Sequence, residues 1–141
     1  MADTLGDRVD CYFEFIYGDV YDLPNLVSQP FGVVLVLGDL YHIADPPYVL
    51  TKVRDLTKEH LIVQTSNILP RSGNLARFVV RRDRTAEGAT SVRGSRGVWR
   101  FTVECFESIL LHAGFRVLEK RSHPLLHQNH LPWYCDLAEH S

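Results

Sequence analysis

The chain has 141 residues, of which 45% are hydrophobic and 23% charged, and its formal net charge is −2. This length fits one domain with one core, and the near-neutral charge argues neither for nor against a nucleic-acid partner. The longest apolar run, residues 33–37, is far too short to cross a bilayer. Three scattered cysteines and an acidic start without an apolar segment predict a reduced, cytoplasmic protein that does not enter the membrane.

The amino-terminal part is predicted to hold a mobile end and one strand. Residues 1–10 are polar and predict a disordered or mobile terminus, and residues 11–141 predict a single domain. Residues 11–17, Cys-Tyr-Phe-Glu-Phe-Ile-Tyr, are rich in aromatic and branched side chains and predict a strand. Pro24 and Pro30 limit the stretch that follows to one or two helical turns.

The organising stretch of the chain runs from residue 31 to residue 65. Residues 31–37 and 60–65 are continuous apolar runs, typical of strands buried on both faces. Between them, Asp45 and Pro46 begin an amphipathic helix. Strand, crossover helix and strand predict a right-handed parallel unit, so the turn after the first strand opens where α/β folds bind ligands. This turn contains Gly38, Asp39, Tyr41 and His42.

Residues 67–98 form an arginine-rich insertion without clean periodicity. Eight of the fifteen basic residues lie between Arg71 and Arg100, and all eight are arginine. Thirty residues with little regular structure in a compact domain are typical of a functional insertion or a lid. Only residues 78–80 indicate a short extended piece.

Regular structure is predicted to resume after the insertion. Thr102 is a plausible N-cap for a helix with an apolar stripe, and Gly114 is placed to end it. Residues 115–119 and 131–137 then predict two strands.

This order of elements resembles the carboxyl-terminal part of class I S-adenosylmethionine-dependent methyltransferases, in particular the subgroup around the tRNA wobble-uridine carboxymethyltransferases. The resemblance rests on the turn Gly38-Asp39-Leu40-Tyr41-His42 with Pro46 following, on Trp99, and on Ala113-Gly114-Phe115-Arg116-Val117. It implies an α/β fold with a truncated Rossmann-like sheet. We expect that sheet to be mostly parallel, with an antiparallel carboxyl-terminal strand and helices on its faces.

The sequence departs from the family at its amino-terminal side. The family begins with a strand and a glycine-rich turn that approaches the cofactor, and nothing ahead of Cys11 supplies either. If residues 11–17 are the family's third strand, two central strands are absent and a sheet edge is left open. Two resolutions are open. Residues 11–17 pair directly with the strand at 31–37 or with a neighbouring molecule, giving a smaller sheet, or the chain is a fragment that needs a complementing segment. We favour the smaller sheet, completed by a homodimer that buries this edge.

The resemblance also implies a site. S-adenosylmethionine would lie against Asp19, Val20 and Gly38, with Asp19 toward the adenine amino group. On chemical grounds His42 is the candidate base, Tyr41 would orient the nucleophile, and Asp39 would hold the imidazole tautomer. The structural alternative for Asp19 is a turn aspartate that satisfies its own backbone. The alternative for His42 is that it caps the next helix or packs on Tyr41.

Two further groups of residues have weaker functional readings. His123, His127 and His130 recur near Cys135 at metal-like intervals, but no paired Cys-x2-Cys accompanies them, so solvated histidines are favoured and no metal is predicted. The arginines of the insertion could contact the phosphates of tRNA, or form a solvated loop.

The predicted function is methyl transfer to a small-molecule or RNA nucleophile. The rival, supported by the missing glycine-rich turn, is a non-catalytic dimeric interaction or regulatory remnant that no longer binds S-adenosylmethionine.

Overall fold

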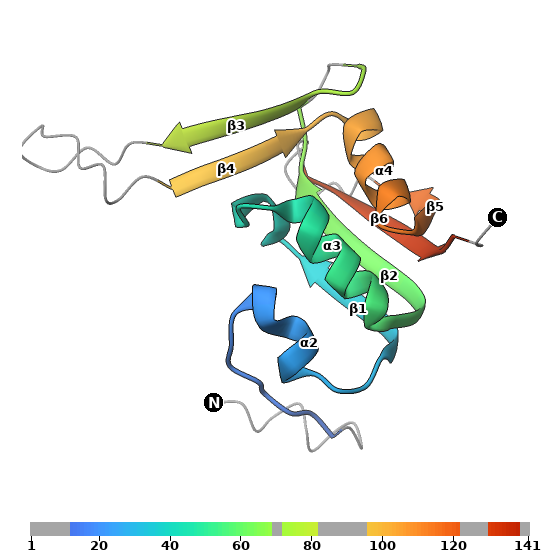
Figure 1. Ribbon diagram of the computed structural model, residues 1–141. Coiled ribbons are helices and arrows are strands. Elements are labelled where there is room, and N and C mark those ends of the chain that lie inside the picture. Colours follow the sequence, from blue (N-terminus) through green and yellow to red (C-terminus); the bar gives the residue numbers. More distant parts are fainter. Residues whose placement is uncertain (1–11, 69–71, 82–95, 122–129, 139–141) are drawn as a thin grey trace, which may run out of the picture.

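The computed structural model describes residues 12–68, 72–81, 96–121 and 130–138, so the predicted mobile terminus lies outside the described part (Figure 1). It contains a four-stranded sheet, a two-stranded ribbon and several helices. No helix in the described residues is long and apolar enough to span a membrane. In chain order the elements are η1 (Val20–Asp22), α2 (Leu23–Leu26), β1 (Phe31–Leu37), η2 (Leu40–His42), α3 (Pro46–Asp55), β2 (Thr57–Ser66), β3 (Ala76–Arg81), β4 (Arg96–Phe101), α4 (Val103–His112), β5 (Phe115–Lys120) and β6 (His130–Leu137).

The four-stranded sheet has the order β1-β2-β6-β5. Only β1 and β2 are parallel, whereas β6 runs antiparallel to both of its neighbours. The α/β class and the antiparallel carboxyl-terminal strand are confirmed, but the prediction of a mostly parallel sheet is wrong. The physical reason is the position of β6, which lies between β2 and β5 and so makes two antiparallel pairs.

The predicted parallel unit is present as β1–α3–β2. The Asp45 carboxylate accepts a hydrogen bond from the backbone N–H of Tyr48 at 3.1 Å, and Pro46 occupies the first turn. These are the N-cap and proline positions that a helix start favours. Helix α3 buries Val49, Leu50 and Val53 against the sheet.

The core lies on one face of the sheet. Helices α3 and α4 both lie on that face (Figure 1), and Phe106 of α4 packs on Trp133 of β6 with 4.7 Å between ring centroids. The other face of the sheet is uncovered at β1, where alternate apolar side chains are 51–58% exposed. Helices on both faces of the sheet were expected, and the described helices cover only one. The exposed side chains are Phe31, Val33, Leu35 and Leu37.

The strand predicted at residues 11–17 is not formed. Residues 12–17 belong to no strand and all are exposed, with Phe15 at 88% and Tyr17 at 103% of full exposure. Cys11 lies outside the described residues. Strand propensity reflects packing on a sheet, and in the described chain this aromatic segment pairs with no strand.

The arginine-rich insertion contains more regular structure than predicted. Strands β3 and β4 pair antiparallel as a ribbon that projects from the body of the protein (Figure 1). The extended piece at residues 78–80 is confirmed, but the absence of other regular structure is corrected. Phe78 and Trp99 face each other across the ribbon with ring centroids 4.9 Å apart, a cross-strand pair that periodicity along one strand does not reveal. Residues 82–95 lie outside the described part.

Helix α4 begins and ends as predicted. The Thr102 hydroxyl oxygen accepts from the N–H of Cys105 at 3.4 Å and from the N–H of Leu75 at 3.0 Å, and it donates to the carbonyl of Gly73. One buried hydroxyl therefore caps α4 and fixes the entry to β3. Gly114 ends the helix with a φ of 90°, the left-handed conformation that favours glycine.

Candidate functional site

The site is built on the turn that follows β1. Gly38 has a φ of 82°, which redirects the chain at the carboxyl end of the strand. The backbone N–H of His42 donates to the carbonyl of Asp39 at 2.8 Å, closing the short helix η2. The side chain of Leu40 is fully buried and anchors the turn in the core. The turn therefore presents Tyr41 and His42 from a fixed backbone.

Two residues far away in the sequence hold the end of this turn. The Tyr21 hydroxyl accepts a hydrogen bond from the backbone N–H of Asp45 at 3.0 Å. The Trp99 indole N–H donates to the carbonyl of Ala44 at 3.2 Å. Sequence reasoning missed both contacts, and the Trp99 side chain is half-buried. The two partners come from η1 and from the ribbon, so no local signal near the turn could have revealed them.

An apolar cavity of about 300 Å³ lies among α2, β1 and α3 and reaches the turn. Val20 and Asp39, two of the sequence-predicted site residues, line it together, and Gly38 sits between Asp39 and Leu37, another lining residue. The other lining side chains are apolar: Leu23, Val27, Phe31, Val34, Leu35, Val36, Ile43, Val49, Val53 and Leu56. Of the three predicted cofactor residues, Val20 lines the cavity, whereas Asp19 and Gly38 do not line it but each adjoin a lining residue in the sequence.

Asp19 lies directly before Val20 and caps η1. Its Oδ1 accepts a hydrogen bond from the backbone N–H of Tyr21 at 3.0 Å. This is the turn contact that the structural alternative proposed for this residue. Its other carboxylate oxygen has no hydrogen-bond partner in the described part of the chain, so capping and ligand contact are compatible.

The candidate base His42 is exposed and packs on Tyr41, with 4.3 Å between ring centroids. This is the packing that the structural alternative described. Within the described residues, the Asp39 carboxylate makes no hydrogen bond to the imidazole. Asp39 is therefore placed at the cavity and not behind His42.

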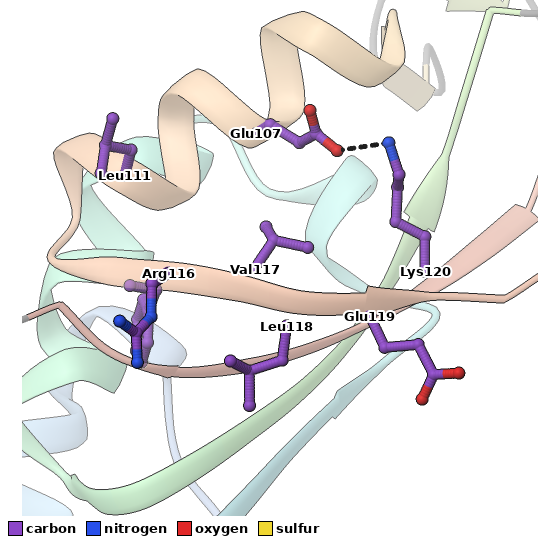
Figure 2. Close-up of a pocket in the computed structure, with 8 residues that line it drawn as sticks. Glu107, Leu111, Arg116, Val117, Leu118, Glu119 and Lys120 are labelled. Carbon is purple, nitrogen blue, oxygen red and sulfur yellow. Dashed lines mark ion pairs between the residues drawn. The ribbon is translucent and has the colours of Figure 1, made fainter.

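A second hollow, of about 430 Å³, lies between α4 and β5, away from this turn (Figure 2). Lys120 and Glu107 form an ion pair of 2.7 Å beside it, and Val117 points toward α4 while Leu118 points to the opposite side. None of the sequence-predicted site residues lines it. The described residues contain no group of three metal-ligating side chains, and His123 and His127 lie outside them.

The chain is similar in structure to S-adenosylmethionine-dependent methyltransferases over most of its length. No protein-family model and no curated protein matches the sequence.

Three solved structures illustrate the likeness. The glycopeptide N-methyltransferase MtfA complexed with S-adenosylmethionine matches with a TM-score of 0.61 and 10% identity, over 86% of this chain and 63% of that chain. A S-adenosylmethionine-dependent methyltransferase from Clostridium acetobutylicum matches with a TM-score of 0.53 and 14% identity, over 86% and 63%. The N-terminal domain of EvdMO1 with S-adenosylhomocysteine bound matches with a TM-score of 0.53 and 19% identity, over 87% and 52%.

The likeness extends to the fold and not to a particular enzyme. The chain spans less than two thirds of each of these structures, and every identity is below 20%. The finer resemblance to the tRNA wobble-uridine subgroup stays a prediction.

Proposed function

We propose that the chain is a methyltransferase module that binds S-adenosylmethionine at the carboxyl end of β1 and takes part in methyl transfer there. The observation that carries this proposal is the single cavity lined by Val20 and Asp39, in the turn that also holds the Tyr41–His42 ring contact. A cavity of about 300 Å³ is at the lower end for ligand sites and suits a flat base such as adenine.

The residues present fit the adenosine part of the cofactor. Val20 offers an apolar contact to the base, and the free carboxylate oxygen of Asp19 can accept from an exocyclic amino group. Gly38 leaves backbone accessible at the turn, because no atom lies within 4 Å of the position that a side chain would take. When bound, the cofactor supplies an electrophilic methyl group.

The turn supplies the acid–base groups for the acceptor. A neutral imidazole at His42 can accept the proton that the nucleophile loses, and the exposed position of this ring gives an acceptor access to it. Tyr41, in ring contact with His42, restricts the orientation of the imidazole.

Calorimetric titration with S-adenosylhomocysteine tests the cofactor site. We expect saturable binding with a Kd below 1 mM, and at least tenfold weaker binding for Val20→Trp, which fills the cavity. Val80→Trp is the matched control, because Val80 is 51% exposed on β3 and does not line the cavity. Absence of binding at millimolar ligand would contradict the proposal.

One observation favours RNA over a small molecule as the methyl acceptor. The register of the ribbon places Arg77 opposite Arg100. Like charges directly opposite each other destabilise a strand pair, and phosphate groups would relieve this repulsion.

Filter binding of tRNA at several salt concentrations tests the RNA acceptor. For Arg77→Glu we expect weaker binding and a salt dependence with a slope smaller by about one to two. Arg121→Glu is the control, since Arg121 is exposed at the end of β5 and pairs with Glu119. Equal loss in both variants, or no binding by the wild type, would contradict the RNA assignment.

The second candidate function is a non-catalytic interaction module. The exposed apolar side chains of β1 favour it, since they form a contact surface that methyl transfer does not require. A chain that fails to bind S-adenosylhomocysteine but self-associates through β1 would support this function over the first.

A further inference from the structure

Two apolar parts of the chain are left without a neighbour in the described residues. The first is β1, which stands at one end of the sheet order, so its outer edge pairs with no described strand. The second is the segment 12–17, which belongs to no sheet. Both are rich in the aromatic and branched residues that favour strand pairing: β1 is Phe-Gly-Val-Val-Leu-Val-Leu, and the segment is Tyr-Phe-Glu-Phe-Ile-Tyr.

The sequence of β1 has none of the charged or proline residues that prevent edge-to-edge association of sheets. Its seven residues include no charge and no proline, and the register shift in its pairing with β2, between Phe31 and Val33, places the extra residue on β2. Exposed edges in monomeric proteins are normally blunted by lysine, proline or a covering element. The outer edge of β1 therefore resembles an interface rather than a solvent-facing edge.

The cavity described above reaches β1. It is lined by Val20, Leu23 and Val27, which lie in or next to η1 and α2, by Val49, Val53 and Leu56 of α3 and its end, and by side chains of β1. None of the residues of α2 is fully buried, so this helix does not pack tightly on β1. A strand added to β1 would place one row of side chains under α2 and continue the exposed apolar face with the other row.

We propose that two copies of this chain exchange their segments 12–17, each segment pairing with β1 of the other copy. The segment has six residues and β1 has seven, so the lengths match. In its own chain the segment runs past α2 on the side away from β1 (Figure 1). The exchange is reciprocal, as a two-fold symmetric interface requires, and it pairs both unpaired elements at once. The added strand would lie against the same cavity that is proposed for adenine, so the exchange competes with cofactor binding there.

Complementation between two variants tests the exchange. Phe15→Glu places a charge in the segment, and Leu35→Lys places one on β1; the two side chains are 88% and 58% exposed, so neither change disturbs the core. Leu111→Lys is the matched control on α4, where Leu111 is 65% exposed. Light scattering after size-exclusion chromatography gives the mass, and far-ultraviolet circular dichroism verifies folding.

The expected pattern is specific to the exchange. Wild type and Leu111→Lys have twice the monomer mass, and Phe15→Glu and Leu35→Lys alone are monomers. An equimolar mixture of these two variants forms a heterodimer, because one of its two contacts is wild type at both positions and the other joins opposite charges. A monomeric wild type overturns the proposal. A dimer that survives Phe15→Glu but not Leu35→Lys also overturns it, since β1 would then pair with another element, such as β1 of the second copy.

Discussion

The hydroxyl of Tyr21 accepts a hydrogen bond from the backbone N–H of Asp45 at 3.0 Å, although 24 residues separate them. Asp45 is at the same time the N-cap of α3, through its contact with the N–H of Tyr48. The start of α3 is therefore tied to η1, the element that follows Asp19. This contact sets the distance between the two halves of the candidate cofactor site.

Replacing Tyr21 by phenylalanine should loosen this connection. We expect the free energy of unfolding to fall by about 0.5–1.5 kcal/mol, the net value of one intramolecular hydrogen bond. Tyr48→Phe is the control, since its ring stacks on Tyr21 at 6.1 Å but no hydrogen bond of its hydroxyl occurs in the described residues. Urea unfolding followed by circular dichroism measures both, and equal losses would show that the Tyr21 contact contributes nothing specific.

A methyl group at Gly38 should be costly although there is room for it. Gly38→Ala introduces no contact within 4 Å, but the φ of 82° is strained for a residue with a side chain, so we expect a loss of about 1 kcal/mol. In Gly32→Ala the new methyl group would lie 3.7 Å from the Glu59 carboxylate, an ordinary contact, and φ is not positive. This control should be nearly neutral in urea unfolding. A neutral Gly38→Ala would mean that the turn can change its conformation.

Local chemistry was sufficient to predict much of this fold. Asp45 with Pro46, and Thr102 with Gly114, begin or end helices through contacts within a few residues, and the structure confirms these positions. The β1–α3–β2 unit follows from apolar runs and a connection of crossover length. The methyltransferase-like architecture was likewise predictable, because it depends on the order of these elements.

Pairing over long distances was not predictable. The segment at residues 12–17 has the composition of a strand, but a strand exists only beside another, and in the described chain the segment pairs with none. Strand β6 follows β5 in the sequence, yet its position next to β2 decides that the sheet is mostly antiparallel. Trp133, fully buried at the centre of the core, likewise gives no local sign of its role.

Part of the candidate site was predictable from the sequence, and part was not. Gly38, Asp39, Tyr41 and His42 were predictable as a group because they follow one strand. Their relation to Val20 was expected only through the resemblance, and the cavity lining brings Val20 and Asp39 together. The contacts of Tyr21 and Trp99 depend on how distant elements pack, which no sequence pattern near the turn encodes.

Removing the Thr102 hydroxyl should destabilise α4 and the entry to β3 together. Thr102→Ala leaves the N–H of Cys105 without its cap and removes the side-chain contacts to Leu75 and Gly73, at a buried position. We expect a loss of about 1–3 kcal/mol in the free energy of unfolding. Thr102→Ser keeps the hydroxyl and should retain most of the stability. A similar loss in both variants would assign the effect to the methyl group.

The ion pair between Asp136 and Arg116 predicts a pH dependence. Arg116 donates to both carboxylate oxygens, at 2.6 and 3.1 Å, and this contact lowers the pKa of Asp136 below its ordinary value. Because the folded pKa is the lower one, the unfolded chain takes up the proton first. The stabilisation is complete above the unfolded pKa of about 4 and is lost as the pH falls through the folded pKa.

Urea unfolding between pH 7 and pH 2.5 tests this dependence. The difference in stability between wild type and Asp136→Asn should be constant from pH 7 to about 5 and should shrink below about 4. Asp55→Asn is the control, since Asp55 is exposed and makes no ion pair with any described residue. A difference that grows on acidification would contradict the sign of the shift.

Cys135 should be the less reactive of the two described thiols. Its side chain is fully buried in β6, and burial, together with the charges of Asp136 and Glu107, raises its pKa to about 12. At pH 8 its thiolate fraction is then on the order of one in ten thousand. Cys105 is only partly buried on α4, so we expect iodoacetamide to label it at least tenfold faster. Peptide mapping by mass spectrometry separates the sites, and both should react alike in guanidinium chloride. Equal labelling rates in the native protein would contradict this expectation. They would mean that Cys135 in β6 becomes accessible as readily as Cys105 in α4, although Trp133 of β6 is packed in the core.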